Sequence, residues 1–227
     1  MHAGSPRARG LWARRGLALP ARIDRSTRSL LLRQLYLALY EERGFREAAD
    51  IAEQAVRLGV LPEVAHQDAA RALQALGEVD AAAGHLRLAA RTGSVQRRPF
   101  HWWTLGSVLF LARRYEEAIS VMARAARWGT TDKPLYQGHL AVVRCASGQR
   151  VPELPALIDR LAEAPSGQGY GRFVLGLMAF YAGRREEARR YLASFLSARE
   201  GGRVAVTLSL GGEIALARET LAALANG

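Results

Sequence analysis

The sequence predicts an all-α protein in which helical hairpins follow one another along the chain. Three observations support this. Ala and Leu are abundant while Val, Ile and Thr are sparse, a balance that favours helices over strands. An alanine recurs at nearly constant intervals, and glycines recur between the periodic segments. A hairpin cannot bury its apolar face alone, so such units are expected to stack into a solenoid.

The recurring alanine marks the second helix of each predicted hairpin. It moves from Ala48 to Ala82 and Ala118, in steps of 34 and 36 residues. Ala188 follows 70 residues later, which is two units of 35, and Ala217 only 29 later. A small side chain at this position lets two helices of a hairpin cross closely, so the repeat has a packing reason.

The pattern around these alanines places the helices and turns in order. Second helices are predicted over residues 45–55, 79–89, 115–125, 185–195 and 214–224. One unit over residues 134–168 is degenerate, because Pro152 and Pro155 distort the start of its second helix. Glycines lie at or beside the turns inside the hairpins, where positive φ is easily adopted: Gly44, Gly77, Gly148, Gly183 and Gly212.

The third unit carries the most specific motif. Its pattern is Trp102-x2-Leu105-Gly106-x2-Leu109, followed by Ala118-x3-Met122-x2-Ala125. This resembles the tetratricopeptide repeat (TPR) signature, W-x2-L-G-x2-Y followed by A-x3-F. The resemblance extends over residues 29–225. It implies an all-α, right-handed superhelical solenoid of about five to six TPR-like hairpins over residues 29–227.

Residues 1–28 fall outside the repeat and hold much of the charge. They contain seven Arg against one acid, Asp24, so +6 of the total +11 lies here and +5 in the remainder. We expect a basic, flexible N-terminal tail. Two alternatives stay open. The segment could anchor the protein electrostatically to nucleic acid or anionic lipid, or fold back and fill the groove with Leu11, Trp12, Leu17 and Leu19.

No pattern in the sequence points to catalysis, a metal or a cofactor. The five histidines form no His-x3-His or HExxH arrangement. The single cysteine, Cys145, excludes an internal disulfide and a cysteine-based metal framework. No apolar stretch approaches the ~18 residues that a membrane span needs. We therefore predict a non-enzymatic, cytoplasmic protein that needs no metal and no cofactor.

The TPR resemblance implies that the first helix of each hairpin lines a binding groove. Carrying the repeat register across gives these groove residues: Arg33, Tyr40, Gln67, Arg71, Phe100, Trp103, Phe110, Phe173, Leu177, Phe180 and Tyr181. From the third unit onward the groove is aromatic and aliphatic, so it suits an apolar peptide or helix of another protein. The alternative is that these side chains are core, because the solenoid curls tightly or the register is shifted by one residue.

The last predicted helix, Glu213 to Ala225, is almost wholly apolar. Solenoids normally finish with a helix whose outer face is polar. We therefore predict an end-docking face for a partner or a second copy of the chain, made of Ile214, Leu216, Leu221 and Leu224.

Together these features predict a non-catalytic scaffold or adaptor that holds a segment of another protein in an apolar, aromatic groove. The alternative function is a repeat protein that associates with nucleic acid or an anionic membrane through its Arg-rich N-terminal tail.

Overall fold

The computed structural model describes residues 5–19 and 23–226. These residues form thirteen α-helices and one short 3-10 helix, and no strand occurs among them, so the all-α prediction is confirmed. The chain divides into two compact units, Met1–His101 and Trp102–Gly227. No helix within the described ranges is long and apolar enough to cross a membrane.

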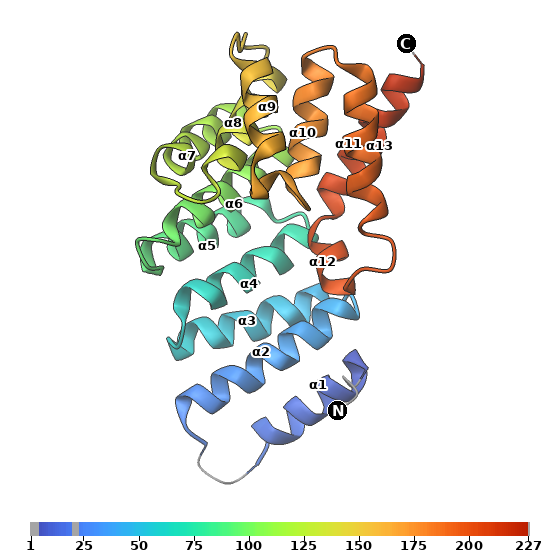
Figure 1. The fold of residues 1–227 in the computed structure, drawn as a ribbon. Helices are drawn as coiled ribbons and strands as arrows, with labels where there is room; N and C mark the ends of the chain where they lie inside the picture. Colours follow the sequence, from blue (N-terminus) through green and yellow to red (C-terminus); the bar gives the residue numbers. More distant parts are fainter. Residues whose placement is uncertain (1–4, 20–22, 227) are drawn as a thin grey trace. The chain divides into compact units, whose positions relative to one another are not determined.

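Unit 1 is a series of helices in which each packs against the next along the chain (Figure 1). The helices are α1 (Pro6–Leu17), α2 (Arg25–Glu41), α3 (Phe45–Leu58), α4 (Pro62–Ala75) and α5 (Val79–Thr92). Helices α2 and α3 form one hairpin, and α4 and α5 form the next.

Helix α6 (Arg98–Leu111) contributes its first four residues to unit 1 and the rest to unit 2. Unit 2 continues with α7 (Tyr115–Trp128), α8 (Lys133–Ala146), α9 (Leu154–Glu163), a 3-10 turn (Pro165–Gly167), α10 (Gly171–Tyr181), α11 (Arg185–Ser197), α12 (Val204–Ser209) and α13 (Gly211–Ala225). Helix α8 packs on α7, α9 and α10, while α13 packs on both α10 and α11 (Figure 1).

The alanine register sits at the tightest packing positions. All five repeat alanines are fully buried: Ala48, Ala82, Ala118, Ala188 and Ala217. Two first-helix glycines permit equally close crossings. A Cβ on Gly106 would lie 2.3 Å from Cγ of Met122, and one on Gly176 would lie 2.5 Å from Cγ of Leu192. The interval at which alanine recurs in the sequence is therefore the interval at which helices cross closely.

The turns follow the glycine prediction only in part. Gly77, Gly148 and Gly183 have positive φ, as expected. Gly44 has a φ of −75°, because the left-handed residue of that turn is Arg43, one position earlier. Gly212 is the second residue of α13 and does not have a positive φ. The α6–α7 turn also uses an arginine, Arg113, with a φ of 60°.

The prediction of a flexible tail over residues 1–28 is wrong for residues 6–17, which form α1. Ser5 caps this helix by accepting a 3.3 Å hydrogen bond from the Ala8 amide. Gly10 and Ala13 are buried, and a Cβ on Gly16 would lie 3.0 Å from a methyl carbon of Leu31 in α2. The packing face of α1 is made of small residues, so it carries no hydrophobic periodicity that the sequence could reveal.

The fold-back hypothesis for the N-terminal segment identifies the wrong side chains. Only Leu17 packs inward, beside a cluster of Leu32, Ala55 and Ala65. Leu11, Trp12 and Leu19 are 49%, 65% and 59% exposed.

Candidate partner-binding pocket

The two predicted groove arginines of unit 1 both form ion pairs with a buried aspartate. Arg33 Nε and Arg71 Nη1 each lie 3.4 Å from a carboxylate oxygen of Asp68. Burial raises the pKa of Asp68, while the charges of Arg71 and Arg33 lower it. These arginines therefore compensate an internal charge, and their presence on first helices has a structural cause.

The other predicted groove residues of unit 1 are wholly or partly core. Tyr40 is buried between the rings of Tyr36 and Phe45, with centroid distances of 5.7 and 5.2 Å. Gln67 is also buried, and Phe100 is half-buried against the ring of His101. The alternative interpretation, that first-helix aromatics are core, therefore applies to Tyr40.

Unit 2 gathers its first-helix aromatics into one cluster. Trp103 donates from Nε1 to His139 Nδ1 at 3.0 Å, and its ring lies 4.9 Å from that of Tyr170. Phe173 is fully buried, with its ring 5.3 Å from that of Phe195. The prediction that Phe173 faces a partner is therefore wrong: this side chain belongs to the core.

Tyr170, Glu213 and His139 are buried titratable groups in this part of unit 2. The Tyr170 hydroxyl donates to Glu213 Oε1 at 3.2 Å, linking the start of α10 to the first turn of α13. Burial raises the pKa of Glu213 to about 7 and lowers the pKa of His139 to about 3. His139 is therefore neutral at physiological pH, whereas Glu213 titrates near it.

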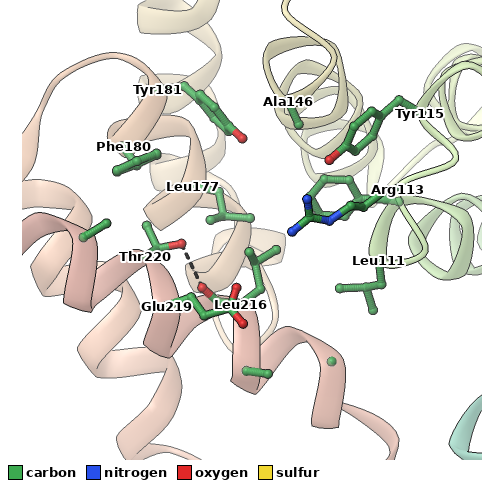
Figure 2. Close-up of a pocket in the computed structure, with 14 residues that line it drawn as sticks. Leu111, Arg113, Tyr115, Ala146, Leu177, Phe180, Tyr181, Leu216, Glu219 and Thr220 are labelled. Carbon is green, nitrogen blue, oxygen red and sulfur yellow. Dashed lines mark hydrogen bonds between the residues drawn. The ribbon is translucent and has the colours of Figure 1, made fainter.

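Four predicted groove residues meet at a pocket of about 490 Å³ in unit 2 (Figure 2). Phe110 lies on α6, and Leu177, Phe180 and Tyr181 lie on α10. The remaining lining comes from the last residue of α6, the α6–α7 turn, the first residue of α7, the last residue of α8, and α13. These residues are Leu111, Arg113, Tyr115, Ala146, Gly212, Ala215, Leu216, Glu219, Thr220 and Ala223.

The lining of the pocket is part apolar and part polar, and it includes one charge of each sign. Leu111 and Leu216 contribute aliphatic surface, and Arg113 extends into the space from the α6–α7 turn (Figure 2). Glu219 contributes a carboxylate from α13. Within residues 5–19 and 23–226, neither Arg113 nor Glu219 forms an ion pair, so both charges can meet a ligand.

The predicted end-docking face is not formed. Ile214 and Leu224 are buried, and Leu224 packs with Ala179 and Ala188 of α10 and α11. Leu221 is half-buried, and Leu216 lines the pocket. Helix α13 therefore turns its branched side chains inward, and its exposed positions include Arg218, Ala222 and Ala225.

The sequence prediction missed the contributions of Arg113, Tyr115 and Glu219. It assigned groove positions to first helices only, whereas here a turn and the last helix supply part of the lining. The polar positions of α13 were the available signal, since Glu219 belongs to the short polar run Arg218–Thr220 in a largely apolar helix.

Comparison with known proteins identifies the fold. No protein-family model matches the sequence, and no curated protein matches it. A solved structure from the functional characterization of Pseudomonas aeruginosa pilF matches with a TM-score of 0.57 and 19% identity, covering 88% of this chain and 90% of that chain. That protein contains TPR repeats, and the match confirms a TPR-like helical-repeat fold.

Proposed function

From a TPR-like fold with a partly apolar pocket, we propose that this protein is a non-catalytic scaffold that holds a segment of another protein. The observation that carries the proposal is the pocket between α6, α10 and α13. Two of its aromatic residues remain partly accessible, since Tyr181 is 41% exposed and Phe180 is half-buried, whereas Phe110 is buried. Repeat folds of this kind commonly bind other proteins, which supports a protein as the ligand.

The lining favours an apolar segment with charges beside it. A volume of about 490 Å³ suits a few side chains and not a folded domain. Partner residues that enter would cover Phe180, Tyr181 and Leu216. An acidic group on the partner would pair with Arg113 and a basic one with Glu219, so the charges would fix the direction in which the segment binds.

Affinity capture with matched variants tests this function. The intact protein and a Phe180→Ala/Tyr181→Ala variant are immobilised, and captured proteins are identified by mass spectrometry. Burying one such ring contributes roughly 1.5–3 kcal/mol, so the variant should bind the true partner at least about tenfold more weakly. Trp128→Ala removes a ring that is more exposed than Phe180 or Tyr181 and lies outside the pocket lining, and it serves as the control.

A partner captured by the intact protein and the control, and lost from the pocket variant, supports the proposal. Circular dichroism must show that the variant keeps its helices. An unchanged set of captured proteins with an intact fold would exclude this pocket as the binding site.

A further inference from the structure

The outward face of α1 combines apolar and cationic side chains. Leu11 and Trp12 are 49% and 65% exposed, and Leu19, just beyond the helix, is 59% exposed. The Arg15 guanidinium lies 5.0 Å from the centre of the Trp12 ring. Large apolar groups that stay exposed beside cations are typical of a surface that binds another protein or a membrane.

The charge of α1 has one sign only. The helix PRARGLWARRGL contains four arginines and no acid. Arg9 and Arg14 are bonded to Glu41 and Glu47, the second at 3.0 Å, and so fasten α1 to the rest of unit 1. Arg7 and Arg15 form no ion pair within the described ranges of the chain, so their charges are available to a ligand.

We propose that this outward face of α1 binds an anionic lipid bilayer. Trp12 and Leu11 enter the interfacial layer, where an indole ring is favoured because it has both an apolar body and a polar N–H group. Arg7 and Arg15 lie at the level of the headgroups and pair with their anionic oxygens. Helix α1 stays packed on α2, so the protein attaches at the bilayer surface through one side of a folded helix.

Size and composition favour a bilayer over other partners. Twelve residues give a strip about 18 Å long and 10 Å wide, roughly 200 Å², whereas a stable protein interface buries about 800 Å² on each side. Duplex nucleic acid would use the arginines and gain nothing from Leu11 or Leu19. A fluid bilayer needs no matching shape, and it uses both kinds of side chain.

A second exposed tryptophan in the same chain provides an internal comparison. Trp128 on α7 is 60% exposed, and the Arg127 guanidinium lies 5.2 Å from its ring. However, α7 carries two acids and two arginines, so its net charge is zero. The proposal therefore assigns bilayer binding to α1 and not to α7, because only α1 adds a net positive charge to the exposed ring.

Vesicle co-sedimentation of the full chain tests the assignment. Vesicles of phosphatidylcholine alone are compared with vesicles that also contain about 30% phosphatidylglycerol, at physiological ionic strength. Binding is expected only to the anionic vesicles. Trp12→Ala and Leu11→Ala should each weaken it about fivefold to tenfold, and Arg15→Gln several-fold, while Trp128→Ala should have no effect.

Three results would overturn the proposal. One is the absence of binding to anionic vesicles. Another is binding that both Trp12→Ala and Leu11→Ala leave unchanged. The third is tighter binding to a short DNA duplex, with vesicle binding that depends on the arginines alone. Phe180→Ala should leave vesicle binding intact, so a failure of the pocket proposal and a failure of this one can be told apart.

Discussion

Phe173 and Tyr181 lie on the same helix, α10, and both carry large aromatic rings, yet their environments differ. Phe173 is fully buried against Phe195, whereas Tyr181 is 41% exposed at the pocket. Both positions came from the same first-helix register. At the residue scale, we therefore propose that Tyr181 and Phe180 contact the partner, while Phe173 contributes packing energy.

Glu213 is a buried residue whose charge state makes stability depend on pH near neutrality. Its carboxyl accepts a hydrogen bond from Tyr170 through Oε1, and Oε2 is buried with no hydrogen-bond partner. Burial raises its pKa from 4.5 to about 7. The unfolded chain therefore ionises Glu213 at lower pH than the folded chain does. Folding is disfavoured progressively as the pH rises from about 4.5 to about 7, and by a constant amount above that.

The variant Glu213→Gln should remove this dependence, because glutamine keeps an acceptor for Tyr170 and does not ionise. Above pH 7 it should be more stable than the parent by at most about 3 kcal/mol, and the advantage should vanish below about pH 4.5. Denaturant unfolding of both proteins between about pH 4 and pH 9 measures the difference. Parallel stability curves over that range would contradict the assignment.

For the helices as elements, the contacts between neighbours depend on small residues. The repeat alanines and Gly106 and Gly176 let neighbouring helices approach closely. Helix α1 follows the same rule, since Gly10, Ala13 and Gly16 form its contact with α2. Not every helical glycine has this role, because a Cβ on Gly84 in α5 would meet nothing within 4 Å.

Two glycine substitutions should therefore act in opposite directions. Gly176→Ala would place a Cβ 2.5 Å from Leu192 Cγ, a fully buried neighbour, and should destabilise the protein by about 1–3 kcal/mol. Gly84→Ala gains helix propensity without a clash and should stabilise it by about 0.5–1 kcal/mol. Thermal unfolding of both variants checks the pair. Equal shifts of the same sign would show that close approach at Gly176 is not limiting.

At the scale of the whole molecule, the repeat units depend on their neighbours. Helices α2, α3 and α4 of unit 1 each pack against both the preceding and the following helix. Removing a terminal helix therefore exposes the next. Helix α1 covers Leu31, Leu35 and Ala38 of α2, through contacts at Gly10 and Gly16.

Deleting residues 1–19 should consequently lower the melting temperature by roughly 5 °C or more, since a loss of 1 kcal/mol shifts a chain of this size by about 2–4 °C. The control is Trp12→Ala, which removes a mostly exposed side chain and should leave the melting temperature nearly unchanged. Differential scanning calorimetry measures both. An unaltered melting temperature in the truncated protein would mean that α1 contributes nothing to the fold.

The sequence by itself determined the helical class, the TPR-like repeat and the positions of the close crossings. It could do so because an alanine at a helix crossing is a local requirement that repeats with the unit, as Ala48, Ala82 and Ala118 show. It also placed Phe110, Leu177, Phe180 and Tyr181 on the groove side, and these four line the pocket, although Phe110 and Leu177 are themselves buried.

The accessibility of individual side chains could be known only from the tertiary structure. A shift of one residue turns a helical side chain by about 100°, which is enough to move a ring such as Phe173 from a groove into the core. Helix α1 packs through glycine and alanine, which leave no hydropathy pattern, so the sequence did not reveal that these residues form an ordered helix. Arg113 and Glu219 lie 106 residues apart in the chain, and the folding of unit 2 places them on the same pocket.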